Sequence, residues 1–180
     1  MKVKSLAIDK LVTQRLILIP FTIQLCKNLL NDDYSDLEIL NLKKGKSWPD
    51  NDVMETLPRI INNLSKVESP TGFESWMIIK KETLEIIGDL GFKGYNHDKK
   101  NIDIGYGIIK EERKKGYAEE AVKEIINWAF ATEIVTEITA NCLAQNTNSI
   151  NLLTKVNFIE LKTENGMKYW SLENQNFKTN

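Results

Sequence analysis

A strand with two glycines on one face runs into a basic turn and then an amphipathic helix between residues 101 and 130. In the run IDIGYGII, alternation places Asp103, Gly105 and Gly107 on one face of the strand and larger apolar residues on the other. Glycine weakens the interior of a strand unless another group must approach closely. The run therefore predicts a strand that accepts a ligand along a bare face.

The turn RKKGYA, residues 113–118, follows this strand and opens the helix. Glycine allows backbone conformations that other residues avoid. The first N–H groups of a helix have no intrahelical partner, and the helix dipole adds about half a positive charge there. With Arg113, Lys114 and Lys115 around these groups, the turn predicts a pyrophosphate site. Alone, the six residues would also suit a solvated basic turn, and the bare strand before them favours the anion site.

Missing motifs and the composition argue against several other kinds of binding protein. The dinucleotide fingerprint lacks its third glycine, and no complete P-loop occurs. The balance of 24 Lys+Arg against 25 Asp+Glu argues against a dedicated nucleic-acid binder. Because His97 is the single histidine and Cys26 and Cys142 lie far apart, no metal site is expected.

The 180 residues, 42% hydrophobic, are expected to form one domain, residues 1–180. The run MKVKSLAIDK has no apolar core of a signal peptide, and no segment approaches the ~20 apolar residues of a membrane span. We therefore expect a cytoplasmic protein with no membrane partner, either a monomer or a homodimer.

Periodicity predicts a mixed α/β fold built mostly from antiparallel hairpins rather than regular βαβ units. Thr22 is the expected N-cap of the first helix, and Asn165-Gly166 predicts a tight hairpin. Strands are expected over residues 13–21, 73–81, 84–95, 101–109, 135–143, 158–163 and 167–172, and helices over 22–30, 117–130 and 146–156.

Residues 31–72 hold helical patterns interrupted by a glycine and two prolines. Asp52 and Glu55 have capping-box spacing, which would place Pro58 inside a helix and kink it. A start near Thr56 would instead place Pro58 in the first turn. Both starts are open at this point.

Four segments, in this order along the chain, resemble the GCN5-related N-acetyltransferase (GNAT) superfamily, and within it the ribosomal-protein N-terminal acetyltransferases. TQRLILIPF is similar to the Thr-x-Arg-Leu-x-Leu opening of that branch, and IDIGYGI to the fourth strand of the superfamily. Arg113-x-x-Gly116-x-Ala118 is similar to its pyrophosphate loop, (Gln/Arg)-x-x-Gly-x-(Gly/Ala). ANCLAQNTNSINLLTKVNF resembles its fifth strand and fourth helix. The resemblance covers nearly the whole chain and is weakest over residues 31–72.

The resemblance implies a mixed sheet of about seven strands that splays open between its fourth and fifth strands, with acetyl-CoA in the opening. Backbone groups near Ile108 and Ile109 would pair with the pantetheine amides. Asn146 and Ser149 would lie near the pantetheine and the thioester sulfur. The N–H groups that would hold the pyrophosphate belong to Arg113, Lys114, Lys115, Gly116, Tyr117 and Ala118.

Three positions depart from the family pattern. Asn157 replaces a glycine at a helix end, where asparagine also tolerates the left-handed cap. Asp103 replaces a longer glutamate. Leu153 stands where many members carry a tyrosine that protonates the leaving thiolate, so that route is excluded here.

The acceptor is expected to be a primary amine. An α-amine with a pKa near 8 is roughly a tenth neutral at pH 7, whereas a lysine amine is about a two-thousandth neutral. Because no histidine falls on an expected strand or helix, a protein N-terminal α-amine, which asks little of a base, is favoured. Asp103 is the candidate base, or a solvated strand-edge acid. Ser149 is the candidate hydrogen-bond or proton donor to the thiolate, or a helix cap.

The leading hypothesis is direct acetyl transfer from acetyl-CoA to a protein N-terminal α-amine. Three alternatives are open: an acetyltransferase acting on a polyamine, aminoglycoside or amino acid, a non-catalytic acyl-CoA-binding module, and a nucleotide-binding protein.

Overall fold

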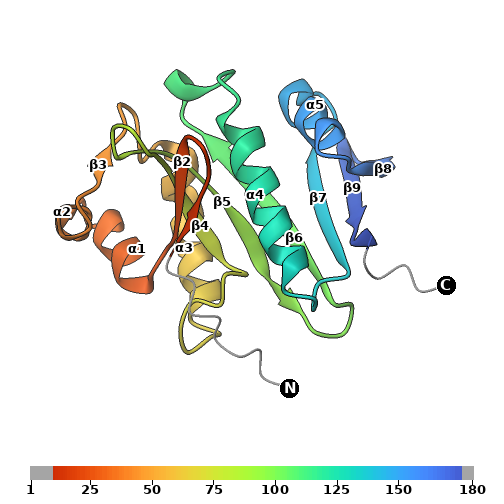
Figure 1. Cartoon of the computed structure of the whole chain (residues 1–180), viewed down its shortest axis with the longest axis horizontal. Coiled ribbons are helices and arrows are strands. Elements are labelled where there is room, and N and C mark those ends of the chain that lie inside the picture. Colours follow the sequence, from red (N-terminus) through yellow and green to blue (C-terminus); the bar gives the residue numbers. More distant parts are fainter. Residues whose placement is uncertain (1–9, 176–180) are drawn as a thin grey trace.

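The computed structural model describes residues 10–175, which build one large sheet with helices on both faces (Figure 1). The strand order is β1-β2-β4-β5-β6-β7-β9-β8, and β3 pairs with β5. The strands are β1 (Leu11–Val12), β2 (Leu16–Pro20), β3 (Lys43–Lys44), β4 (Ser75–Lys80), β5 (Glu85–Asn96), β6 (Asn101–Ile108), β7 (Glu137–Leu143), β8 (Ile159–Glu164) and β9 (Met167–Glu173). The helices are α1 (Ile23–Leu30), α2 (Ser35–Ile39), α3 (Asn51–Leu64), η1 (Lys110–Glu112, a 3-10 turn), α4 (Tyr117–Ala131) and α5 (Thr147–Lys155).

The seven longer strands coincide with the seven expected ones, and β1 and β3 are two-residue additions. All pairings are antiparallel except β3 with β5 and β6 with β7. The mixed, mostly antiparallel α/β fold is therefore confirmed.

Helix α4 covers one face of the sheet, against β2, β5 and β6, and α3 lies on the other face (Figure 1). Each helix presents a stripe of apolar residues at helical spacing to the core. The buried stripe of α4 consists of Ala121, Val122, Ile125, Ile126 and Ala129. That of α3 consists of Val53, Leu57, Ile60 and Leu64.

Helix α3 begins two residues before the capping-box start at Asp52, whose placement of Pro58 inside the helix is confirmed, and the start near Thr56 is wrong. Its N-cap is Asp50, whose side chain accepts a 3.0 Å hydrogen bond from the Val53 N–H. Pro58 lies inside the helix with an exposed ring. A proline inside a helix costs ~3 kcal/mol, whereas each fully buried aliphatic side chain contributes ~1.5–3 kcal/mol. Burial of the continuous apolar stripe therefore outweighs the proline.

The sheet opens between β6 and β7, the equivalents of the fourth and fifth strands in the family resemblance. These parallel strands pair only from Asn101 with Glu137 to Ile104 with Ala140. Beyond Ile104, β6 stays paired with β5, while β7 stays paired with β9. The second half of β6 thus has one unpaired edge.

Three left-handed residues expected from the sequence are present, two in a hairpin and one at a helix end. Asn165 and Gly166 have φ values of 50° and 76° in the β8–β9 hairpin, as a type I′ turn requires. Asn157, just after α5, has a φ of 68°. Asparagine therefore fills the helix-ending position where the family has glycine.

Candidate active site

The bare face of β6 lies at the sheet opening. A Cβ added to Gly105 would have no atom within 4 Å, and one added to Gly107 would meet only the Asp89 Oδ1, at 3.8 Å. On the opposite face Ile102 and Ile104 are buried. The structure thus confirms a strand that is smooth on one side and anchored in the core on the other.

The free edge of β6 belongs to alternate residues. The N–H of Ile109 donates to the carbonyl of Ile87 at 2.9 Å, so this amide is committed to β5. Because successive residues of a strand direct their backbone groups to opposite edges, Tyr106 and Ile108 face the opening. The Ile108 carbonyl accepts a 2.7 Å bond from the Arg113 Nε. Of the two residues expected to bind pantetheine, Ile108 keeps a free N–H on the open edge, whereas the Ile109 N–H is bonded to β5. Tyr106, which was not expected from the sequence, lies on the same edge as Ile108.

The turn after η1 forms a concave main-chain surface. Lys114 and Gly116 have left-handed φ values of 62° and 82°, and Gly116 is the N-cap of α4 without a side-chain cap bond. The first backbone bond of α4 runs from Glu120 to the Gly116 carbonyl, at 3.1 Å, so the N–H groups of Tyr117 and Ala118 have no intrahelical partner. Such successive N–H groups form an anion-binding nest.

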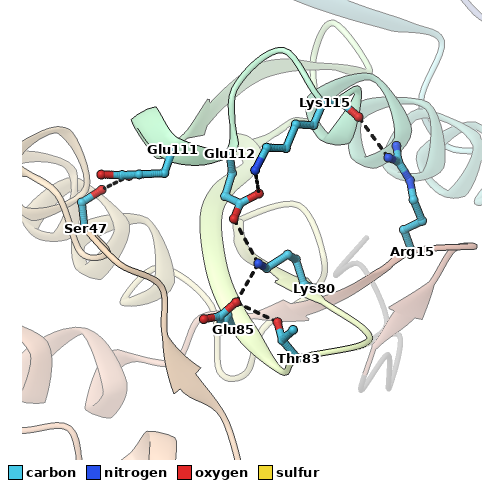
Figure 2. Close-up of polar contacts among 8 residues, drawn as sticks. All are labelled: Arg15, Ser47, Lys80, Thr83, Glu85, Glu111, Glu112 and Lys115. Carbon is cyan, nitrogen blue, oxygen red and sulfur yellow. Dashed lines mark hydrogen bonds and ion pairs between the residues drawn. The ribbon is translucent and has the colours of Figure 1, made fainter.

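A hydrogen bond and two ion pairs hold η1 and the turn that follows it (Figure 2). The Ser47 hydroxyl donates to Glu111 at 2.6 Å. Glu112 lies between two ammonium groups, Lys80 at 3.0 Å and Lys115 at 2.9 Å. Burial alone would raise the pKa of Glu112, but the hydrogen bonds from Lys115 and Lys80 outweigh it and lower the pKa. Glu112 is therefore an ionised anchor at neutral pH.

Arg15 holds the turn from the other side, and sequence reasoning gave it no role (Figure 2). Its guanidinium donates to Glu120 at 2.6 Å and to the Lys115 carbonyl at 3.0 Å. It also lies 4.6 Å from the centre of the Tyr117 ring. Thr13 donates a 2.6 Å bond to the same glutamate. The Thr-x-Arg segment of the resemblance, together with a glutamate in the first turn of α4, was the sequence feature that could have predicted this role of Arg15.

Glu119, the other glutamate in the first turn of α4, is also paired with cations. Glu119 contacts Lys123 at 2.7 Å and Lys155 at 2.5 Å, and these hydrogen bonds lower its pKa. Since carboxylates at a helix N-terminus would repel an anion, this pairing matters. Arg113 and Lys114 are exposed in the same turn.

Asn146 and Ser149 lie together at the start of α5. The Asn146 side chain accepts a 3.2 Å bond from the Ser149 N–H and is the N-cap, so the cap role belongs to Asn146. The Tyr106 hydroxyl reaches across the opening to the Ser149 carbonyl at 3.5 Å. Burial raises the pKa of Tyr106 to about 12, which keeps this phenol protonated.

Asp103 is held in the paired half of β6. It stands opposite Thr139 of β7, whose hydroxyl donates to it at 3.0 Å, and it forms an ion pair with Lys93. Its lone pairs are thus already engaged by a cation and a hydroxyl.

Asp89 is the acid that sequence reasoning missed. It stands on β5 directly opposite Gly107. Burial raises its pKa to about 7; the nearby Asp50 adds to this rise and Arg59 opposes it. The sequence feature that could have identified Asp89 is its position as the single carboxylate in the apolar run IIGDLGF.

Two cavities continue from the bare face of β6 along α3. The inner one, of about 170 Å³, has Asp89, Gly105 and Gly107 on its walls. The outer one, of about 650 Å³, extends to the segment after α3 and to the end of the β5–β6 hairpin. Asn63 and Lys93 line both cavities. We call the two together the α3 groove.

The model of the acetyltransferase (GNAT) domain matches residues 15–159. The chain belongs to the GNAT acetyltransferase family. An uncharacterized N-acetyltransferase of Bacillus subtilis (strain 168), YjdG, is 36% identical over 160 residues, which are 89% of this chain and 95% of the relative.

Solved GNAT structures share the fold. The microcin C7 self-immunity acetyltransferase MccE, solved with acetyl-CoA and AMP, has a TM-score of 0.64 at 15% identity, over 94% of this chain and 98% of its own. The ribosomal-protein-S5-alanine acetyltransferase of Vibrio fischeri has a TM-score of 0.64 at 16% identity, over 94% and 99%.

As a GNAT enzyme, the protein is an N-acetyltransferase that uses acetyl-CoA as its donor. Its own geometry fits that donor: a thin chain can lie where Gly105 and Gly107 leave space, beside a free strand edge and ahead of the nest at α4. Among residues 10–175, no three His, Cys, Asp or Glu side chains come together as a metal site. No helix within the same residues is long and apolar enough to cross a bilayer.

Proposed function

We propose that this GNAT enzyme acetylates the N-terminal α-amine of a protein. The observation that carries the proposal is the α3 groove, whose two cavities meet at Asn63 and Lys93. A compact amine would need only the inner cavity. An extended peptide could instead occupy the length of the groove and present its first nitrogen beside the bare face of β6.

The charge of the groove also favours a peptide. Its walls carry four acids and three cations, so the acids exceed the cations by only one. These are Asp52, Arg59, Lys66, Glu68, Glu74, Asp89 and Lys93. A polyamine would be repelled by the cations, whereas a peptide with one charged amine and a neutral backbone would not.

On the donor side, we assign the pantetheine of acetyl-CoA to the free edge of β6 at Tyr106 and Ile108. We assign the pyrophosphate to the nest formed by residues 113–118, where N–H groups and the charges of Arg113 and Lys114 would meet it. Asn146 and Ser149 would lie beside the thioester, with the Ser149 hydroxyl as hydrogen-bond or proton donor to the departing thiolate. Asp103 remains the sequence-based candidate for the base.

A second candidate acceptor is a small polyamine. An adjoining hollow of about 360 Å³ at the start of α3 is lined by Asp52, Glu55, Thr56 and Arg59, and Asp50 caps the same helix. Asp52, Thr56 and Arg59 also line the inner cavity. This local excess of carboxylates would attract a polycation.

The test compares acceptors with the same enzyme and acetyl-CoA. We expect free thiol to appear with peptides that carry a free N-terminus, and not with the same peptides after N-terminal blocking, even when they contain lysine. Mass spectrometry should locate the acetyl group on the α-nitrogen. Faster turnover of spermidine or of lysine side chains would contradict the proposal and favour the second candidate. We expect the reaction to occur in the cytoplasm, in keeping with Cys26 and Cys142, both buried and free.

A further inference from the structure

Asp89 differs in its partners from four other acids of β6 and of the turn into α4. Within residues 10–175 its carboxylate forms no hydrogen bond or ion pair. Asp103, Glu112, Glu119 and Glu120, by contrast, are each held by a cation. A half-buried carboxylate without a partner is costly, and such a group in a cavity suggests a function.

The position of Asp89 suits an acceptor amine. Its register partner is Gly107, and its Oδ1 lies 3.8 Å from the point where a Cβ on Gly107 would stand. The carboxylate therefore lies over the bare face, one residue before Ile108 and its free edge. It lines the inner cavity of the α3 groove, which is the approach that an acceptor would take.

The surroundings of Asp89 come from three directions. Asp50, Asp52 and Arg59 face it from α3, Lys93 lies farther along β5 on the wall of the same cavity, and Arg113 comes from the turn before α4. Burial and Asp50 disfavour the charged form, while Arg59 favours it. These effects leave a carboxyl group that can change its charge near neutral pH, with its pKa raised to about 7. A general base works best with a pKa close to the working pH.

We propose that Asp89, rather than Asp103, is the general base that deprotonates the acceptor amine. The Asp89 carboxylate accepts one proton from the ammonium group. The neutral nitrogen then attacks the thioester carbon, an N–C bond forms, and the C–S bond breaks with its electron pair left on sulfur. The proton that the nitrogen sheds as the amide forms goes to that sulfur, and Asp89 returns its own proton to solvent.

This inference rests on the proposed position of acetyl-CoA, but not on the identity of the acceptor. The experiment therefore uses whichever amine the wild-type enzyme turns over fastest. If peptides are inert and another amine reacts, the proposed acceptor is wrong, and Asp89 is tested with that amine over a pH range extended to the pKa of the amine.

Asp89→Asn and Asp103→Asn form the matched pair, since both remove a carboxylate with little change in shape. For Asp89→Asn we expect kcat at about pH 7 to fall on the order of 100-fold, with acetyl-CoA affinity retained in calorimetry. The deficit should shrink about tenfold by about pH 9, because an α-amine is then largely neutral without help. Asp103→Asn should show no deficit that depends on pH.

Three results would overturn the proposal. A deficit in Asp89→Asn that is constant across pH would mean a structural role only. A rise in KM with unchanged kcat would make Asp89 a counter-ion for the bound ammonium. A pH-dependent loss of activity in Asp103→Asn, with Asp89→Asn active, would identify Asp103 as the base.

Discussion

Arg15 and Glu120, which are 105 positions apart in the sequence, meet through a 2.6 Å contact between Nε and Oε2 beside the first turn of α4. The backbone N–H of Arg15 donates to the same carboxylate at 2.8 Å. Burial would raise the pKa of Glu120, but the bonds from Thr13 and Arg15 outweigh it and lower the pKa. Thr13 and Arg15 thus fix one of the two carboxylates in the first turn of α4, beside the proposed pyrophosphate nest.

Arg15→Gln should weaken acetyl-CoA binding about tenfold, because the Lys115 carbonyl and Glu120 lose their shared donor and the turn loses its fixed shape. Calorimetry with acetyl-CoA measures the change. Lys162→Gln is the matched control, since Lys162 also pairs with a glutamate, at 2.7 Å, and lies over a tyrosine ring, but on β8. Equal losses of affinity in both variants would contradict a specific role for Arg15.

Gly105→Val should abolish most acetyl transfer while leaving the fold intact. A Cβ at this position meets nothing within 4 Å, and valine is a better strand residue than glycine. The side chain would, however, occupy the bare face on which the pantetheine is proposed to lie. We expect the KM for acetyl-CoA to rise at least about tenfold, with an unchanged or higher melting temperature. An active variant with a normal KM would mean that the donor lies elsewhere.

Much of this architecture could be predicted from the sequence because local patterns dominated. The alternation in IDIGYGII, the stripe of α4 and the Asn165-Gly166 turn each reflect one periodicity or one backbone requirement. Helix α3 could not, because its start depends on tertiary burial of a stripe that runs through Pro58.

The site was harder to predict than the fold. Which amides face the opening depends on the β5–β6 register, which commits Ile109 to Ile87. The choice between Asp103 and Asp89 depends on partners that the sequence does not reveal. Lys93 and Thr139 pair with the Asp103 carboxylate, whereas the Asp89 carboxylate has no partner within the described residues 10–175.

Substitutions at Asn157 test whether asparagine fills the helix-ending position where the family has glycine. With a φ of 68°, it stands in the left-handed region just after α5. Asn157→Gly should leave the free energy of unfolding unchanged or raise it by a few tenths of a kcal/mol, whereas Asn157→Ala should lower it by ~1 kcal/mol. Urea unfolding measures both. A stable alanine variant would show that the helix ends differently.

The raised pKa of Asp89 should make the free energy of unfolding depend on pH. Its folded-state pKa of about 7 lies above the ~3.9 of an unfolded aspartate, so the native state binds more protons between these values. Stability must therefore fall as pH rises through this window, by ~4 kcal/mol at most and by less because the side chain is partly exposed.

Asp89→Asn should remove that slope, since an amide does not titrate. Relative to the wild type, the variant should gain on the order of 1–3 kcal/mol in unfolding free energy between about pH 5 and about pH 8, as measured by urea unfolding. Glu112→Gln is the control: the pKa of Glu112 is lowered, so its stabilisation is complete above the ordinary glutamate range and its effect should be flat over the same interval. If the Asp89→Asn difference is equally flat, the Asp89 carboxylate is ionised in the native state throughout, and it is not a base poised near neutral pH.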